Sequence, residues 1–243
     1  MPIHDWSRVE ASIFHSFHHS WILEIARALN GGLLPPEFYA LIERPPVRSE
    51  SDVLLEAVHQ EVWPGMKRAP VPLPARPRRF VLDVAPDDPS RLVESSVAVR
   101  RDGVNDVVAV VEIVSRGHKA NRATVEQFVA DAHELFAAGI HLVVADIHAP
   151  CPYDPRGMNE TISEAWATGH DMPRPHSPLT VAYYEADCGV KATLWTVAVG
   201  SDLPDVPLRL RPDLWVPVPL EATYRLAFDV MPRHWRELLQ PEG

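Results

Sequence analysis

Apolar residues recur at helical spacing in three parts of the chain. From Ala11 to Asn30 they fall every three or four residues, and the two glycines that follow provide a stop. The same spacing predicts a helix from Ala123 to Ala138, ended by Gly139, and another from Leu220 to Val230. Because an apolar stripe must be buried, each helix is expected to pack against a sheet.

Runs of β-branched and aromatic residues predict the strands of that sheet. The predicted strands are residues 38–43, 52–55, 92–100, 107–115, 140–147, 179–186 and 190–199. The pair Asp102 and Gly103 predicts a hairpin between the third and fourth strands. The run from Val107 to Val114 is apolar on both faces except at Glu112, which is typical of a strand covered on both sides.

The order of these elements indicates an α/β fold. Strand, helix and strand follow one another between residues 107 and 147, which predicts a right-handed crossover and a parallel pair. Proline-rich stretches at 63–79 and 151–178 are expected to be loops, and the second contains one short helical turn around 162–168. We therefore predict a single domain, residues 1–243, with a central mixed β-sheet and flanking helices. Its core spans about residues 11–150, and residues 151–243 add a C-terminal hairpin and helix.

Composition narrows the classes of function. The chain has 243 residues and a formal charge of −10, which argues against a protein that coats nucleic acid or an anionic membrane. The segment from Lys67 to Arg101 is a local exception, with eight basic and four acidic residues. It is a candidate contact for nucleic acid, with a solvated surface as the alternative.

The sequence also predicts a location. Two cysteines are too few for a disulfide framework, and the N-terminus lacks the features of a signal peptide. With no long apolar run, we expect a cytoplasmic protein that makes no contact with a membrane. Nothing in the sequence indicates the oligomeric state. Phosphate-binding loops, dinucleotide fingerprints and serine-hydrolase elbows are absent.

Glu112 is the sharpest chemical signal. A carboxylate inside an aliphatic strand costs several kcal/mol unless it is paired, protonated or bound to a cation. Two interpretations stay open. Glu112 is a metal ligand or general base that projects from the sheet, or it is a structural acid that lies beyond the covered part or pairs with an arginine such as Arg100.

Two further residues near the ends of the predicted central strands are candidates. Asp146 lies near the end of the strand after the crossover, where we favour a solvated position. The polar loop from Ser115 to Arg122 follows the strand that carries Glu112, and ligands tend to bind where such loops converge. Lys119 in this loop is suited to neutralise a phosphate or an anionic intermediate, although we favour a solvated lysine.

Three histidines lie close together in the first predicted helix. The spacing of His15, His18 and His19 places two imidazoles on one face, as a zinc site requires. A convincing site needs further ligands, and no second group with metal spacing is obvious. Because His18 falls beside Phe14 and Trp21, we favour packed or half-exposed structural histidines.

Several motifs together resemble a bacterial family named domain of unknown function 4058. The matching segments are residues 4–6, 14–21, 33–36, 39–43, 111–119, 139–143, 202–208 and 217–220. These segments are distributed along almost the whole length of the chain. This family has no established reaction, so the resemblance implies kinship without an activity.

A more distant similarity is to the restriction-endonuclease-like, or PD-(D/E)XK, superfamily. That superfamily holds one or two divalent cations with an Asp on one strand and a Glu-x-Lys on the next. Asp52 resembles the first acid, Glu112 the second, and Glu43 an additional acid. Position 114 is Val where the pattern has Lys, so Lys119 would substitute from the following loop.

The resemblance implies a function. Asp52 and Glu112 would bind Mg²⁺ or Mn²⁺, which polarises a phosphodiester and activates water. Lys119 would support the attacking water or the transition state, so Glu112, Lys119 and Asp52 are the expected catalytic residues. The expected activity is that of a metal-dependent phosphodiesterase or nuclease of degenerate type. The alternative is a non-catalytic binding or assembly module on the same fold.

Overall fold

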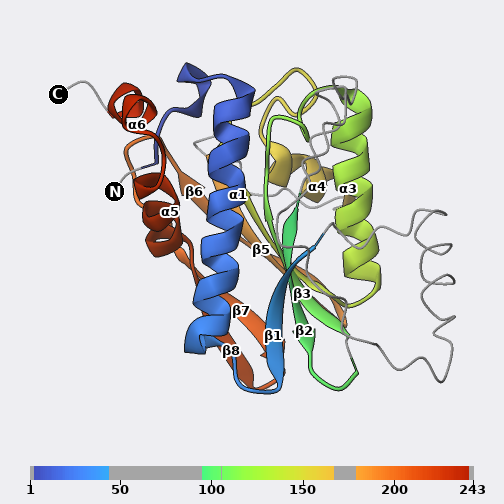
Figure 1. The fold of residues 1–243 in the computed structure, drawn as a ribbon. Coiled ribbons are helices and arrows are strands. Elements are labelled where there is room, and N and C mark those ends of the chain that lie inside the picture. Colours follow the sequence, from blue (N-terminus) through green and yellow to red (C-terminus); the bar gives the residue numbers. More distant parts are fainter. Residues whose placement is uncertain (1–2, 44–94, 105, 167–178, 241–243) are drawn as a thin grey trace, which may run out of the picture. The chain divides into compact units, whose positions relative to one another are not determined.

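Six strands form the central sheet, in the spatial order β1-β2-β3-β4-β5-β6. Figure 1 shows this sheet together with the helices around it. The strands are β1 (Phe38–Glu43), β2 (Ser96–Arg101), β3 (Val107–Ile113), β4 (His141–Asp146), β5 (Leu179–Asp187) and β6 (Gly189–Val197). Neighbours are antiparallel except β3 and β4, which are parallel. The predicted mixed sheet and its parallel pair are confirmed.

The computed structural model describes residues 3–43, 95–104, 106–166 and 179–240. These residues belong to one unit, formed by chain on both sides of the segment 46–92. Asp52, the predicted strand at 52–55, the predicted loop at 63–79 and most of the basic segment lie outside the described residues. The single-domain prediction includes that segment and therefore stays a prediction.

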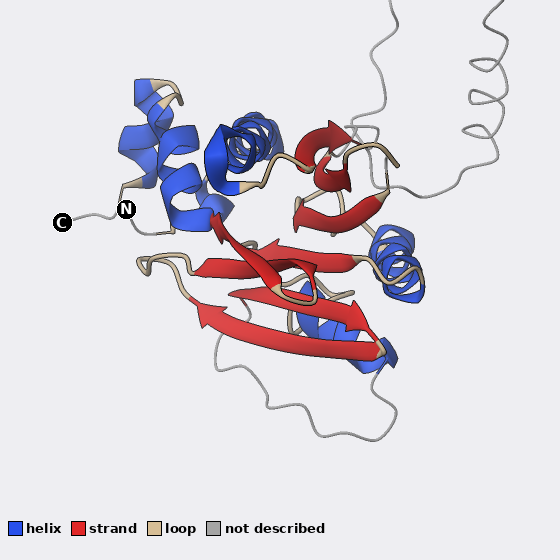
Figure 2. Ribbon diagram, turned by 90° about the horizontal axis from the view of Figure 1, so that it is seen from below, coloured by secondary structure: helices blue, strands red, loops and turns tan. Residues whose placement is uncertain are grey.

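One face of the sheet is covered by α1 (Ala11–Ala28), and α5 (Leu220–Asp229) packs alongside α1 (Figure 2). The aromatic residues of α1, among them Phe17 and Trp21, are fully buried against this face. The Trp21 indole donates a hydrogen bond to Thr223 Oγ1 on α5 over 3.1 Å. The two helices are therefore joined by a buried polar contact as well as by apolar packing.

The opposite face is covered by α3 (Arg122–Ala137) and α4 (Met158–Trp166). The apolar stripe of α3 packs on Val110 and Val144 of the parallel strands. Asn121 caps α3 by accepting a hydrogen bond from the Thr124 amide. At the other end Gly139 has a φ of +72°, a left-handed conformation that favours glycine. The predicted order of strand, helix and parallel strand from β3 through α3 to β4 is thus confirmed.

The C-terminal part contains a second, two-stranded sheet that the sequence analysis did not assign. It pairs β7 (Asp205–Arg211) with β8 (Leu214–Pro219) in antiparallel register, and Pro207 lies opposite Pro217. Prolines argue against a strand inside a large sheet, since they donate no ladder hydrogen bond. In a two-stranded sheet each strand has an open edge, where a missing N–H costs little.

The N-terminal segment is held by a residue more than 200 positions away. The Tyr224 hydroxyl lies 3.2 Å from Trp6 Nε1, 3.1 Å from the His4 amide and 2.8 Å from His4 Nδ1. One phenol can accept two hydrogen bonds and donate one, so all three contacts are satisfied together. The short helix η1 (Trp6–Arg8) is thereby fixed against α5.

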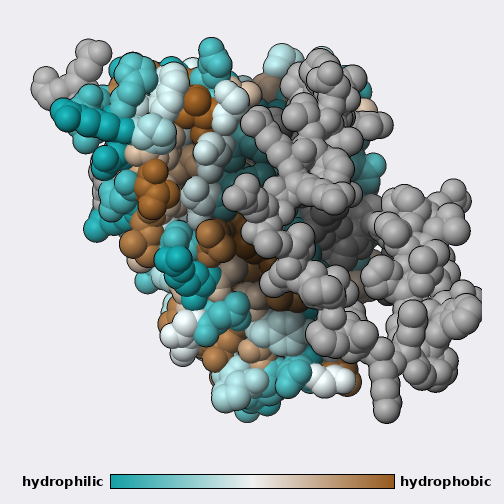
Figure 3. Space-filling model, in the orientation of Figure 1, coloured by the Kyte–Doolittle hydropathy of each residue, from teal (hydrophilic) through white to brown (hydrophobic). Residues whose placement is uncertain are grey.

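The remaining helix, α6 (Arg233–Leu239), follows α5 near the C-terminus. Figure 3 views the molecule from the side of α1 and α5, where hydrophobic residues are interspersed with hydrophilic ones. Leu23 on α1 and Leu226 on α5 are both about half exposed, at 50% and 51%. In the described ranges, no helix combines the length and the apolar character needed to cross a membrane.

Candidate functional site

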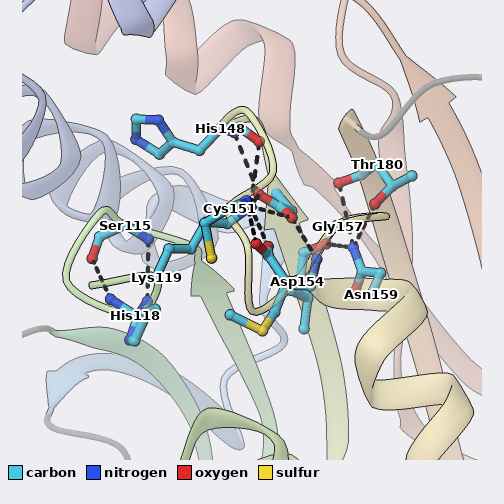
Figure 4. Close-up of polar contacts among 12 residues, drawn as sticks. Ser115, His118, Lys119, His148, Cys151, Asp154, Gly157, Asn159 and Thr180 are labelled. Carbon is cyan, nitrogen blue, oxygen red and sulfur yellow. Dashed lines mark hydrogen bonds and ion pairs between the residues drawn. The ribbon is translucent and has the colours of Figure 1, made fainter. Parts of the chain in front are cut away.

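Polar side chains gather where the parallel strands β3 and β4 end. The loop 114–121 follows β3, and the loop 147–157 follows β4. Carboxyl ends of parallel strands finish at the same edge of a sheet, so these two loops lie together (Figure 4). This edge is the candidate functional site.

Lys119 is at the centre of the site. Its ammonium lies 2.9 Å from each carboxylate oxygen of Asp146 and 2.7 Å from Asp154 Oδ2. It also donates to the His148 carbonyl over 3.3 Å. The lysine side chain is 5% exposed, and both carboxylates are fully buried. The favoured expectation of a solvated Lys119 was wrong, because the lysine reaches inward to two acids on the neighbouring loop.

Asp146 is the better satisfied of the two carboxylates. Besides Lys119, it accepts hydrogen bonds from the Met158 amide over 2.7 Å and the His148 amide over 3.3 Å. Met158 is the first residue of α4, so Asp146 also neutralises the partial positive charge of that helix N-terminus. Burial raises the pKa of Asp146, and the nearby Lys119 opposes that rise. The expected solvated strand end was wrong, since Asp146 is 0% exposed.

Asp154 holds the second loop in place. Its Oδ1 accepts a hydrogen bond from the Cys151 amide over 2.6 Å, and its carbonyl accepts one from the Gly157 amide over 2.9 Å. The contact between Asp154 Oδ2 and Lys119 is an ion pair that lacks the alignment of a hydrogen bond. One ammonium and two carboxylates leave the cluster with a formal charge of −1.

Glu112 lies on the same face of the sheet as this cluster. It is 5% exposed and is paired in register with Val144, and Asp146 follows two residues later on the same face of β4. Arg100, a predicted partner of Glu112, donates two hydrogen bonds to Glu43, at 2.9 and 2.6 Å, and its pairing with Glu112 stays a prediction. Glu43 is thereby engaged in a half-buried ion pair at the edge of the sheet.

The predicted metal site is only partly visible. Asp52 lies outside the described residues, so its pairing with Glu112 stays a prediction. Within the described ranges, no group of three or more His, Cys, Asp or Glu side chains is placed to hold a metal ion. Asp146 and Asp154 are adjacent acids, but the ammonium of Lys119 lies between them.

The histidines of α1 do not form a separate metal site in the described part of the chain. His18 is fully buried, and its Nε2 lies 3.0 Å from the Ile113 carbonyl at the end of β3. Burial lowers the pKa of His18 to about 3, so the ring is neutral at physiological pH. The prediction of a packed structural histidine is confirmed for His18. The rings of His15 and His19 lie side by side on the same helix in a tilted arrangement, with centroids 4.2 Å apart and an interplanar angle of 55°.

A pocket of about 270 Å³ opens beside the cluster. His148 forms part of its lining and is 4% exposed, with its ring 4.0 Å from that of Phe14. Its Nε2 is buried and has no hydrogen-bond partner among the described residues. Burial lowers the pKa of His148 to about 3. Figure 4 shows the ring directed away from Lys119 while the carbonyl faces it.

Comparison with known proteins gives no family for this chain. Models of protein families, curated proteins and solved structures all fail to match it. The resemblance to the domain of unknown function 4058 family and to the restriction-endonuclease-like superfamily therefore stays a prediction.

Sequence analysis missed two features of the site. Asp154 was not singled out, because it lies in a proline-rich stretch without periodicity, and its position before Pro155 indicated only a turn. The helix α4, predicted as a short turn around 162–168, begins earlier at Met158, where Asp146 caps it. Both features depend on a contact with Lys119 or Asp146, which no local pattern reveals.

Proposed function

We propose that the chain is a non-catalytic binding protein built on a nuclease-like core. The observation that carries this proposal is the position of the Lys119 ammonium between Asp146 and Asp154. A lysine that activates water or stabilises a developing charge must face the reacting group. Here the ammonium is buried and shared between two carboxylates, so it has a structural task instead.

The arrangement of acids supports the same proposal. A divalent cation needs several oxygen ligands, and the two acids nearest each other already share an ammonium. The residues present at Asp146 and Asp154 therefore do not fit a divalent ion while Lys119 is in place.

The order of elements supports the nuclease-like part of the proposal. Among the described residues a helix, three strands, a crossover helix and a parallel strand follow one another from α1 to β4, an order similar to that of the restriction-endonuclease-like core. In this proposal Glu112, on the central strand β3, corresponds to the second acid of that superfamily. Proteins that share a fold can differ in activity, so the function has to be argued from the residues of the site.

The pocket beside His148 is the binding site that we propose. It opens at the carboxyl end of β4, where ligands of open α/β sheets commonly bind. Asp5 is the acidic residue in its lining, and the two histidines there add no positive charge at neutral pH, because burial lowers the pKa of His4 to about 4 and that of His148 to about 3. We therefore expect a compact, uncharged or cationic ligand rather than a phosphate.

A charge series of one ring system tests this binding site. Isothermal titration calorimetry at pH 7.5 would compare tryptamine, indole and indole-3-acetate as cationic, neutral and anionic probes. We expect tryptamine to bind roughly twofold to fivefold more tightly than indole, and indole-3-acetate most weakly, because Asp5 attracts cations. Equal or reversed affinities would overturn the expected ligand class.

A pair of matched variants locates the binding. Ala198→Phe fills the pocket mouth, whereas Ala192→Phe makes the same change on the exposed strand β6 outside the lining. Ala198→Phe should remove tryptamine binding and Ala192→Phe should retain it. If both variants bind as the wild type does, or if the wild type binds none of the three probes, the pocket is not the site.

The alternative function is a metal-dependent phosphodiesterase with Asp52 and Glu112 as ligands. The burial of Glu112 on the face shared with Asp146 favours it. Single- and double-stranded DNA and RNA with Mn²⁺ would be incubated with the wild type, Glu112→Gln and the exposed control Glu126→Gln. We expect the same background signal from all three. Cleavage that is lost only in Glu112→Gln would replace our proposal with the phosphodiesterase.

A further inference from the structure

We propose that the Lys119 ammonium occupies a cation-binding site built by Asp146, Asp154 and the His148 carbonyl. The chain would thus carry its own tethered cation, and removal of the lysine side chain would convert the cluster into a site for Ca²⁺ or Mn²⁺. This goes beyond the proposed function, because it holds whichever ligand the neighbouring pocket takes.

The oxygen atoms around the ammonium form the donor set of a hard cation. Three carboxylate oxygens lie 2.7–2.9 Å from Nζ, and a backbone carbonyl oxygen lies at 3.3 Å. Carboxylates combined with a main-chain carbonyl are typical ligands of Ca²⁺. The observed distances suit ammonium hydrogen bonds, so a metal ion would draw the oxygens inward by a few tenths of an ångström.

The charge of the cluster favours a cation of higher charge. Asp146 and Asp154 together bring two negative charges into a region that solvent does not reach, and Lys119 balances one of them. The remaining charge is offset by the amides of Met158, His148 and Cys151, which all point at these carboxylates. A divalent ion in place of the ammonium would neutralise both acids.

The frame of the site does not depend on the lysine side chain alone. Asp146 remains fixed by the start of α4, and Asp154 remains fixed by the turn that begins at Cys151. The Lys119 backbone is held by a hydrogen bond from its amide to the Arg116 carbonyl, at 3.2 Å. Truncation at Lys119 therefore leaves the three carboxylate oxygens and the His148 carbonyl oxygen in place around the space that the ammonium filled.

The experiment compares the full-length wild type with Lys119→Ala. Both proteins would be titrated with CaCl₂ and MnCl₂ at constant ionic strength, and binding would be followed by calorimetry and by the midpoint of thermal unfolding. For a site of about 0.1–1 mM affinity, 10 mM metal should raise the midpoint of Lys119→Ala by about 3–10 °C. The wild type should shift by less than about 1 °C.

A control variant assigns the binding to these acids. Lys119→Ala combined with Asp146→Asn and Asp154→Asn keeps the shape of the site but removes both charges, and it should lose the metal response. If this triple variant still responds as Lys119→Ala does, the proposed site is wrong. Metal binding by the wild type that Glu112→Gln abolishes would instead contradict the non-catalytic function and leave this inference standing.

The test also covers a variant that does not fold. If Lys119→Ala is unfolded without metal, refolding would be attempted in 10 mM CaCl₂ and, separately, in NaCl of matched ionic strength. Recovery of the far-ultraviolet circular dichroism spectrum in CaCl₂ alone supports the inference. A folded variant that binds neither metal, or an unfolded variant that CaCl₂ does not rescue, overturns it.

Discussion

Replacement of Lys119 by methionine tests the energetic importance of the buried cluster. Methionine has a similar length, so Lys119→Met removes the charge without a large cavity. Removal of one partner from a buried ion pair costs about 3–5 kcal/mol, because the other charge stays buried. Asp146 keeps two amide donors and Asp154 keeps one, which limits the loss. We expect the free energy of unfolding to fall by about 4 kcal/mol.

Urea unfolding at pH 7.5, followed by circular dichroism and tryptophan fluorescence, measures this loss. The matched control is Arg233→Met, because Arg233 pairs with Glu237 on α6 while both side chains are largely exposed, at 84% and 57%. Such a surface pair is worth no more than about 0.5 kcal/mol. A loss below about 1 kcal/mol in Lys119→Met would refute the view that the ammonium compensates two buried acids.

The pH dependence provides a second check on the same variant. Burial raises the pKa of Asp146 above its ordinary value, so protonation in the folded state occurs more readily than in the unfolded state. Without Lys119 the rise in the pKa of Asp146 should be larger. The free-energy cost of burying its unpaired carboxylate should then decrease as the pH falls, because the carboxylate becomes protonated. The stability difference between the wild type and Lys119→Met should therefore shrink between pH 7.5 and pH 5. A constant difference would contradict this explanation.

Three further predictions concern groups outside the ion cluster. Burial lowers the pKa of both His18 and His148 from 6.5 to about 3, so the unfolded state binds more protons and stability falls as the pH drops below 6.5. At pH 4 each histidine should lower the free energy of unfolding by about 3 kcal/mol. In urea unfolding, the stability of His18→Gln and of His148→Gln should therefore depend less on pH than that of the wild type. An unchanged pH dependence would argue against burial as the cause. Tyr224→Phe should lower the free energy of unfolding by about 1–3 kcal/mol, because the Trp6 indole loses its acceptor, and a neutral result would mean that water replaces the hydroxyl. Gly139→Ala should lower the free energy of unfolding by about 1 kcal/mol, measured by thermal unfolding. The cause is the positive φ of residue 139 alone, since nothing lies within 4 Å of the added methyl group. An unchanged stability would mean that the backbone at the end of α3 relaxes.

The elements around the parallel pair could be predicted because their hydrophobic pattern is strong. The run from Val107 to Val114 is apolar on both faces, and the following helix shows a clear apolar stripe. The strands β7 and β8 could not be predicted in this way, because their prolines are tolerated only at the open edges of a two-stranded sheet. A local pattern does not reveal how many strands a sheet will have.

The candidate site could be predicted only in part. Glu112 was found because an acid inside an apolar run is unusual, and the structure confirms its burial. The environment of Lys119 could not be deduced, because its partners Asp146 and Asp154 lie 27 and 35 positions further along the chain. Burial of a loop lysine depends on such distant contacts, which cannot be predicted from composition or hydrophobic periodicity.

The contacts of Tyr224 limit how the polypeptide can be divided for experiments. Residues 11–150 contain the crossover and the parallel strands, and so look like a natural fragment to express alone. Such a fragment would lack α5. The Trp21 indole would lose its hydrogen-bond acceptor, Thr223 Oγ1, and Phe17 and Trp21 would lose their ring contacts with Tyr224 and be exposed to water. We expect this fragment to aggregate, so truncated variants of the protein should retain the C-terminal helices α5 and α6.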